Sequence, residues 1–356
     1  MRHFTASLVF CILCFSGTSL ANLWSQSAGR EQGAEAISEF FSTNEQLDIQ
    51  LTYSIEDLQN LSNDSTYIPA ELSYVGDSGD WQNLPAEVRV RGGWRKTNCQ
   101  YTPLKIKLRK DNAINTPFES CRKAKLVLPC FKGKKASDNL IKELMAYKIY
   151  EVLSPYHFKT RLLRIDLRET KKGKTSSQEL PGFLIQDDED FERMHQAKEI
   201  ERFIDHAAQD DLGRVTNALF QYMIGNTDFS AVYLHNEKLF YVDEKIVPVP
   251  YDFDMSGLVD ASYAVVSQVR NEVLPITKVT SRLYRGFEAG ETVLQEVRSE
   301  FLAKEEAVYE SIDKLSTYFS DPREFETSRE YIVDFFEVLR DDDKFRRRIV
   351  DKSRKE

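Results

Sequence analysis

The pattern of apolar and polar residues divides the chain into a first half that is typical of strands and a second half that is richer in helices. Short runs of β-branched or alternating apolar residues, bounded by turn residues, mark the predicted strands. In the first half these runs are residues 47–53, 70–74, 86–90, 104–108, 123–128, 158–167 and 182–185. We read residues 169–179, which are polar, as a loop between the last two strands.

Helical periodicity begins with a segment that Ser137 or Asp138 can cap and that Pro155 stops. The 3.6-residue period returns in residues 209–223 and in two amphipathic segments near the end, residues 292–318 and 323–339. Between them lie the strand-like runs 229–234 and 238–242, a turn at residues 243–245, and residues 246–250, which lead into Asp252. The second half is therefore predicted to be helical, with a small β-hairpin inserted.

These elements predict an α+β protein with a β-rich N-terminal lobe, residues 47–185, and a helical C-terminal lobe, residues 186–340. With 356 residues, of which 41% are hydrophobic, the chain can bury a sizeable core in one large domain or two lobes. Residues 22–46 are polar and predict a flexible lead-in or a surface helix, and residues 341–356 form a densely charged tail.

The first 21 residues have the pattern of a secretory signal peptide. Arg2 and His3 supply a basic start, residues 8–15 are apolar, and small residues precede a cleavage site after Ala21. The alternative is an uncleaved membrane anchor, but the apolar run is short for a span of about 20 residues. We expect a secreted or periplasmic protein with no integral membrane segment after cleavage.

The net charge of −9 argues against a general affinity for nucleic acid or anionic membranes. An anionic ligand must therefore be bound by a local group of basic residues. The mature chain would keep three cysteines, Cys99, Cys121 and Cys130. In an oxidising compartment one disulfide is expected, and the favoured pairs are Cys99 with Cys121 and Cys99 with Cys130.

The candidate chemistry is concentrated in residues 222–259, where a loop ending at Asp228 and the segment from Asp252 to Asp254 enclose the predicted hairpin. This arrangement suits phosphoryl transfer, in which one carboxylate orients or deprotonates a hydroxyl group while an amide and other carboxylates hold Mg²⁺. Asp228 would take the first role. Asn236 and Asp252 would bind the metal, with Asp254 as an additional or alternative ligand. Taken singly, each acidic motif is more typical of a loop cap than of a site.

Basic residues in the first half could bind the phosphates. In the motif RVRGGWR, Arg91 and Gly92 combine a cation with a backbone that can approach a ligand closely, although a hairpin turn with solvated arginines explains the motif too. Lys125, on a predicted strand, is followed by Glu143 on a predicted helix. Kinase-like folds build a lysine–glutamate ion pair in this order, and an ordinary surface charge pair is the alternative.

The segments GNTDFSAVYLHN and PVPYDFDMSGLV resemble the catalytic half of the CotH family of secreted atypical protein-kinase-like proteins. The segments RVRGGWR, PLKIKLRK, KLVLPC and KELMAYKIYEVL are similar to the family's N-terminal half, so the resemblance runs from about Leu51 to Arg285. It implies a protein-kinase-like two-lobed fold and an ATP-dependent kinase that acts on hydroxyl groups of a protein substrate with Mg²⁺ or Mn²⁺.

The resemblance also implies residue roles. Asp228 would be the base-like aspartate and Asp252 the metal-binding aspartate. Glu143 would be the helix partner of a nucleotide-binding lysine. We choose Lys125 for that lysine, with Lys105 and Lys107 as alternatives.

Three features depart from the kinase pattern. Asn236 lies eight residues after Asp228, whereas kinase catalytic loops place the asparagine about five residues on. Asp254 stands where many kinases have glycine, and no GxGxxG motif occurs in the N-terminal half. A non-catalytic envelope or surface protein that binds a partner is therefore the alternative to a kinase, and a metal-dependent phosphohydrolase is a third hypothesis.

Overall fold

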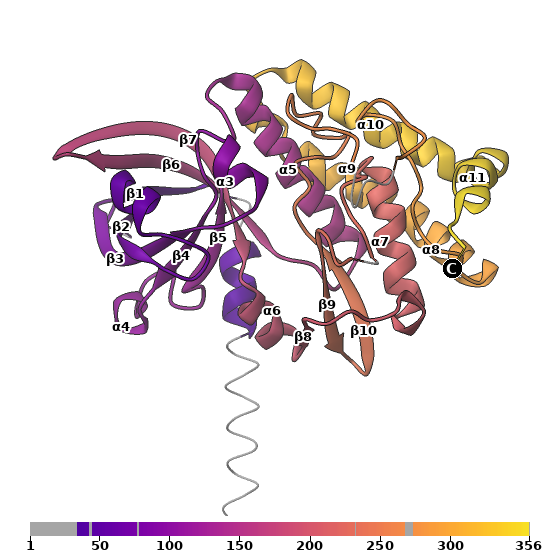
Figure 1. The fold of residues 1–356 in the computed structure, drawn as a ribbon, viewed down its shortest axis with the longest axis horizontal. Coiled ribbons are helices and arrows are strands. Elements are labelled where there is room, and N and C mark those ends of the chain that lie inside the picture. The colour runs from indigo at the N-terminus through magenta and orange to yellow at the C-terminus, as the bar shows by residue number, and fades with distance from the viewer. Residues whose placement is uncertain (1–33, 43–44, 77, 232, 268–272, 356) are drawn as a thin grey trace, which may run out of the picture.

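The computed structural model describes residues 34–42, 45–76, 78–231, 233–267 and 273–355. In this described part of the chain, seven strands form a closed barrel in the order β1-β2-β3-β4-β5-β7-β6, on the left in Figure 1. The strands are β1 (Leu47–Ser54), β2 (Ile68–Val75), β3 (Trp81–Val90), β4 (Leu104–Leu108), β5 (Lys123–Val127), β6 (Thr160–Lys171) and β7 (Lys174–Gln186). Three short helices accompany them: α2 (Ile55–Asn60), α3 (Trp94–Asn98) and α4 (Lys110–Ala113).

The barrel closes through one parallel pairing, that of β1 with β6, while its other neighbouring strands are antiparallel. The register runs from Leu47 opposite Leu163 to Ser54 opposite Thr170. Alternate side chains of each strand point inward, as in the Leu104–Leu108 strand, where the apolar residues are buried and the lysines lie outside. These inward residues make up the barrel's own hydrophobic core.

The predicted protein-kinase-like two-lobed fold is wrong, because the β-rich half is a closed mixed barrel, which the bilobal kinase fold does not contain. The strand positions were predictable from alternation, but alternation does not say which strands pair. The closing pair joins residues as distant in the chain as Leu47 and Leu163. No local pattern marks such a partnership.

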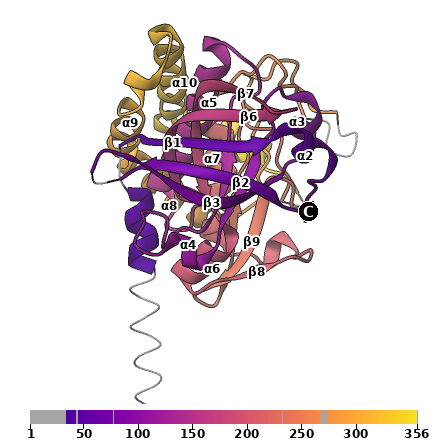
Figure 2. The same cartoon turned by 90° about the vertical axis from the view of Figure 1, so that its left-hand side faces the viewer.

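The second half is built from helices packed around a separate hydrophobic core, on the right in Figure 1. Its central helix, α5, is buried on nearly all sides. A three-stranded sheet of order β10-β9-β8 lies beside these helices in the described chain, and its end reaches the lower edge of the coloured ribbon in both views (Figures 1 and 2). The elements are α5 (Lys134–Leu153), α6 (Asp188–His195), β8 (Lys198–Ile200), η1 (His206–Ala208), α7 (Asp211–Met223), β9 (Glu237–Val242), β10 (Lys245–Pro250), α8 (Glu291–Ala303), α9 (Glu305–Asp313), η3 (Ser316–Tyr318), α10 (Pro322–Arg340), α11 (Asp342–Arg348) and η4 (Val350–Lys352).

Three predicted elements differ from the structure. The polar residues 169–179 are not a loop but the far end of the long β6–β7 hairpin, which turns at Lys172 and Gly173, both with positive φ. Of the predicted strand 229–234, the described residues 229–231 and 233–234 are not assigned to a strand, and paired backbone hydrogen bonds join Ser230 to His235 instead. The helix predicted over residues 292–318 is divided at Lys304 into α8 and α9.

The two ends of the described chain are packed. Residues 34–42 are helical, and Ile37, Phe40 and Phe41 are buried in the barrel's core. In the charged tail, α11 buries Phe345 against the helical core. The predicted signal peptide, residues 1–21, lies outside the described residues. Of the helices that the structure describes, none has the length and apolar character needed to span a membrane.

A disulfide joins Cys99 to Cys130, one of the two pairs that the sequence left open. Cys99 is the C-terminal cap of α3, and Cys130 lies in the loop between β5 and α5. The disulfide therefore ties the short helix α3 to the wall of the barrel. The remaining thiol of the described chain, Cys121, is buried, and burial raises its pKa.

Candidate functional site

A cavity of about 420 Å³ lies where the barrel meets the helical half, and we call it the main cavity. Its wall contains side chains from the loop between β3 and α3, from β5, α5 and α6, and from the loops around β9 and β10. Most of the predicted site residues line it: Arg91, Gly92, Lys125, Glu143, Asp228, Asn236, Asp252 and Asp254. Lys105 and Lys107 are not part of this lining.

The loop after α7 delivers Asp228 to the main cavity. The helix stops before Gly225, whose φ of 63° lies in the left-handed region. The side chain of Asn226 then joins two segments, since its Nδ2 donates to Gln221 Oε1 at 2.9 Å and its Oδ1 accepts from the Asp228 backbone N–H at 2.9 Å. The guanidinium group of Arg285 donates hydrogen bonds to the backbone oxygens of Thr227 and Phe229. The loop is thus both a cap, as its sequence suggested, and the support of a cavity carboxylate.

The Asp228 carboxylate is held on both oxygens. Ser267 Oγ donates to Oδ1 at 3.0 Å, and Asn236 Nδ2 donates to Oδ2 at 3.1 Å. His235 Nε2 lies 3.5 Å from the same Oδ2, and this hydrogen bond raises the pKa of His235. The side chain of Asp228 remains 22% exposed, so it is oriented and still open to the cavity.

Asn236 is the residue whose spacing departed from the kinase pattern, and the structure explains the longer spacing. The turn closed by Ser230 and His235 occupies the extra residues between Asp228 and Asn236. Asn236 has a φ of 56°, and its Nδ2 donates to the backbone oxygen of Asp228 at 2.6 Å as well as to the carboxylate. The amide nitrogen is therefore committed to positioning Asp228, and the amide oxygen is the atom left for a cation.

Asp252 follows β10 in a left-handed conformation, with a φ of 64°. Its backbone N–H donates to the hydroxyl oxygen of Tyr147 on α5 at 2.9 Å, which fixes the turn. Two residues on, Asp254 is 6% exposed and accepts from the Tyr263 hydroxyl at 3.0 Å. Burial raises the pKa of Asp254 to about 6, and the charges of Asp252 and Asp228 add to the effect. The carboxylates of the main cavity therefore lie close enough to repel one another.

This concentration of negative charge fits a hydrated divalent cation. Among the described residues, no group of three or more His, Cys, Asp or Glu side chains is arranged as a ready metal site. The cavity instead offers the carboxylates of Asp252 and Asp254 and the amide oxygen of Asn236. Mg²⁺ is usually held by one or two carboxylates together with waters and substrate phosphates, so this donor set matches its requirements. Mn²⁺ accepts the same oxygen ligands.

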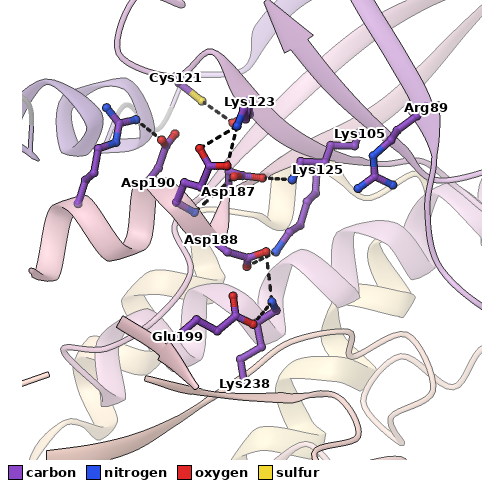
Figure 3. A network of polar contacts seen from close by, with 12 residues as sticks. Arg89, Lys105, Cys121, Lys123, Lys125, Asp187, Asp188, Asp190, Glu199 and Lys238 are labelled. Atoms are coloured by element: carbon purple, nitrogen blue, oxygen red, sulfur yellow. Dashed lines mark hydrogen bonds and ion pairs between the residues drawn. The ribbon is translucent and has the colours of Figure 1, made fainter. Parts of the chain in front are cut away.

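The predicted ion pair between Lys125 and Glu143 is wrong. Lys125 Nζ lies 2.6 Å from Asp188 Oδ1 on α6, and Lys238 Nζ lies 3.3 Å from the other oxygen of Asp188 (Figure 3). Glu143 pairs with Arg95 Nη1 at 3.2 Å. The sequence pattern specified a strand cation and a helix anion, but the fold supplies each of them with a different partner.

The two alternative lysines bind elsewhere. Lys105 lies opposite Lys125 in the β4–β5 register, but its Nζ contacts Asp187 Oδ2 at 2.5 Å (Figure 3). Lys107 Nζ contacts Glu87 Oε2 at 2.8 Å. Both ammonium groups are neutralised away from the main cavity. Lys125 is therefore the one of the three candidate lysines that the structure places at the cavity wall.

Burial changes the charge states of these groups. It lowers the pKa of Lys125 to about 8, although the charge of Asp188 opposes the shift. It also raises the pKa of Glu143, although the charge of Arg95 opposes the shift. Burial also acts to raise the pKa of Asp188, but the charges of Lys125 and Lys238 outweigh it and lower that pKa overall. The ammonium group of Lys125 therefore loses its proton near pH 8.

Sequence reasoning missed several residues of the site. Asp188 stands in an acidic run that reads as a helix cap, and its neighbour Asp187 does cap α6. The ring centroids of Phe158 and Tyr251 lie 4.7 Å and 6.0 Å from Lys125 Nζ, which is a cation–π arrangement. No local sequence motif predicts it. Arg95 belongs to the recognised RVRGGWR motif, and its own role there could have been proposed from that motif. The other missed contacts come from His235, Lys238, Tyr147, Tyr263 and Ser267.

Comparison of the chain with models of known protein families and with curated proteins finds no match in either set. The function is therefore argued from the geometry of the main cavity.

Proposed function

We propose that this protein is a phosphotransferase that moves the γ-phosphoryl group of ATP, bound with Mg²⁺ or Mn²⁺, to a hydroxyl group of a protein substrate. The observation that carries the proposal is the composition of the main cavity. Its wall combines the oriented carboxylate of Asp228, the acidic pair Asp252 and Asp254, and the cations Arg91 and Lys125. Phosphoryl transfer needs this combination, since catalysis consists mainly of positioning and charge stabilisation.

In the proposed reaction, Asp228 accepts the proton of the attacking hydroxyl group. The hydroxyl oxygen forms a bond to the γ-phosphorus while the bond from that phosphorus to the β–γ bridging oxygen breaks. The electron pair of the broken bond leaves with ADP. Asn236 and Ser267 hold the carboxylate of Asp228 during this step, and His235 stabilises its negative charge.

The acidic side of the main cavity would hold the divalent cation through Asp252, Asp254 and the amide oxygen of Asn236. The bound cation would neutralise charge on the nucleotide phosphates. Tyr263 donates to Asp254 and Tyr147 accepts the N–H of Asp252, so both carboxylates are supported from outside the cavity.

The basic side of the main cavity would hold the phosphates. Lys125 is 7% exposed and Asp188 orients its ammonium group. Arg91 lines the same wall, followed by Gly92, whose φ of 83° is a backbone conformation that favours glycine. The loop can therefore bring its backbone close to a phosphate oxygen. The signal-like residues 1–21 support placing this activity in a secreted or periplasmic protein.

The test separates the two proposed aspartate roles. The purified chain is incubated with γ-labelled ATP, Mg²⁺ and a mixture of acceptor proteins, and labelled protein and released ADP are measured. We expect Asp228→Asn to lower transfer about 100-fold or more while nucleotide affinity changes little, because a general base acts in the transition state. Asp252→Asn should lower the Mg²⁺-dependent affinity for ATP itself.

Asp260→Asn is the matched control, because Asp260 is exposed, has a positive φ that asparagine tolerates, and does not line the main cavity. Unchanged transfer in both cavity variants would refute the proposed roles. No calorimetric binding of Mg-ATP at millimolar concentration would refute the phosphotransferase and favour a non-catalytic protein that binds a partner.

A further inference from the structure

A second cavity, of about 140 Å³, lies on the other side of the Arg95–Glu143 ion pair, and we call it the side cavity. Arg95 and Glu143 line both cavities and so form the partition between them. The remaining charged side chains of its described lining are Lys132 and Lys135. The side cavity therefore has a positive lining, in which Glu143 is already paired with Arg95.

The side cavity opens at the N-terminus of α5, the 20-residue central helix of the molecule. The helix follows Gly133, whose φ of 105° is a backbone conformation that favours glycine, and no side chain caps its first turn. Lys135 and Ala136 of that turn belong to the lining. Uncapped amide groups and the positive end of a long helix attract anions.

Two buried polar atoms in the lining have no hydrogen-bond partner among the described residues: Arg95 Nε and Asn139 Oδ1. Arg95 is 8% exposed and Asn139 is 9% exposed. The other nitrogens of Arg95 are engaged, Nη1 with Glu143 and Nη2 with the backbone oxygen of Leu128. Because unpaired buried polar atoms are costly, an unused donor and an unused acceptor in one cavity point to a ligand that carries both an acceptor and a donor.

We propose that the side cavity is a binding site for a phosphate group, either free or carried on a protein side chain. The oxygens of the phosphate would accept from Arg95 Nε, from the first-turn amides of α5 and from Lys132 and Lys135. A phosphate that keeps one proton also has an O–H, which would donate to Asn139 Oδ1. This inference does not depend on phosphoryl transfer in the main cavity, because binding is tested without nucleotide.

The test is calorimetric titration of the whole chain with inorganic phosphate in a chloride buffer near pH 6. We expect saturable binding that the double variant Lys132→Gln/Lys135→Gln weakens at least tenfold, because two charge-assisted hydrogen bonds are lost. Lys134→Gln is the matched control. It removes one charge from the same helical turn as Lys135, but Lys134 does not line the side cavity, so affinity should change less than about twofold.

Two further variants locate the site. Asn139→Asp should abolish binding by placing a carboxylate against the phosphate, and its thermal unfolding is compared with that of the unmodified chain to verify folding. Lys198→Gln, whose side chain is exposed and lines neither cavity, should leave phosphate affinity unchanged. Absence of saturable heat up to about 50 mM phosphate would overturn the proposal. Equal losses in Lys134→Gln and the double variant, or a loss confined to Lys198→Gln, would overturn it as well.

Chemically related ligands test the donor–acceptor argument and identify the source of the phosphate. Sulfate, which carries no proton near pH 6, should bind at least tenfold more weakly than phosphate, and equal binding would overturn the assignment. A phosphoserine peptide that binds more tightly than inorganic phosphate, with the same loss in Lys132→Gln/Lys135→Gln, would identify a phosphorylated protein as the ligand. An affinity for inorganic phosphate alone would identify free phosphate.

Discussion

Lys125 illustrates how a single buried cation can make ligand binding depend on pH. Its pKa of about 8 means that the ammonium group is charged below this pH and neutral above it. Because the charged form attracts phosphate oxygens, the affinity for Mg-ATP should be highest below pH 8. It should fall about tenfold between pH 7 and pH 9, as one charge-assisted hydrogen bond is lost. Calorimetric titrations across this range measure the change.

The control for this pH dependence is Lys125→Arg, whose guanidinium stays charged throughout the range. Lys238 shares Asp188 with Lys125, but its pKa is raised: burial lowers it and the charges of Asp188 and Glu199 more than compensate. It is therefore not expected to lose its proton in this window. An equal fall in affinity in Lys125→Arg would show that another group titrates.

The Arg95–Glu143 pair is a second residue-scale feature with a measurable consequence. Both partners are buried, and Arg95 also lies 3.8 Å from Asp254. Glu143→Gln leaves the guanidinium without its nearest anion, and we expect it to lower the free energy of unfolding by about 3 kcal/mol. Urea denaturation monitored by circular dichroism measures the loss.

Glu189→Gln is the comparison for Glu143→Gln, since Glu189 pairs with Lys123 at 2.6 Å while its side chain is 66% exposed. Its cost should be about 0–1 kcal/mol, as for other solvated pairs. Similar losses in the two variants would mean that burial does not strengthen the Arg95–Glu143 interaction.

At this scale the sequence predicted residue types better than partnerships. Asp228, Asp252 and Glu143 were identified from short motifs, and all three line the main cavity. The partner of Lys125 was misassigned because Asp188 comes from another element, whose position relative to β5 is set by the β5–β7 pairing. Local spacing contains no information about that distance.

Among the elements, α3 is notable because it is only five residues long and still carries Arg95 into the wall of both cavities. Such a short helix has little stability of its own. The disulfide between Cys99 and Cys130, which encloses a sequence separation of 31, fixes its end to the barrel. We therefore expect the helix to depend on this covalent link.

The double variant Cys99→Ser/Cys130→Ser should lower the free energy of unfolding by about 3 kcal/mol, because the unfolded chain regains the entropy of an open loop. Urea denaturation under non-reducing conditions gives the value. The control is Cys121→Ala, which removes the buried free thiol and should cost about 1 kcal/mol. If the two costs are equal, the link does not stabilise the described fold.

Strands were predicted correctly where apolar and polar side chains alternate strictly. They were missed where an exposed strand has a polar sequence. The Leu104–Leu108 strand was predicted with its bounds because one face is buried. The distal residues of β7 are exposed on both faces, so the polar sequence of this hairpin end resembles a loop although the strands pair up to Lys171 and Lys174. Residues 229–234 have a strand-like composition, but the backbone hydrogen bonds of Ser230 are made with His235 across a turn.

For the whole molecule, the described residues form two separate hydrophobic cores, one in the barrel and one among the helices. The main cavity takes residues from both halves, so a ligand bound there connects them. At about 100 times its dissociation constant, Mg-ATP should add about 2.7 kcal/mol to the stability of the folded state. Differential scanning calorimetry should show this as a higher unfolding temperature.

The control is Asp252→Asn, which should lose most of this stabilisation because the variant removes a carboxylate that we propose as a metal ligand. An equal shift in the variant would mean that the nucleotide binds outside the main cavity.

At the scale of the whole molecule, the sequence predicted the mixture of strands and helices but not the closed barrel. Closure depends on which strands meet, and the alternation of apolar and polar residues does not specify the partner of a strand.

The parallel pairing of β1 with β6 also sets an order of events during protein synthesis. β2 can pair with β1 as soon as it leaves the ribosome, but β6 is made more than a hundred residues after β1. At about 5–20 residues per second, one edge of β1 stays open for several seconds. Unpaired strand edges recruit other chains, so a nascent chain that stalls before Thr160 should be more prone to aggregate than one that stalls after Lys171.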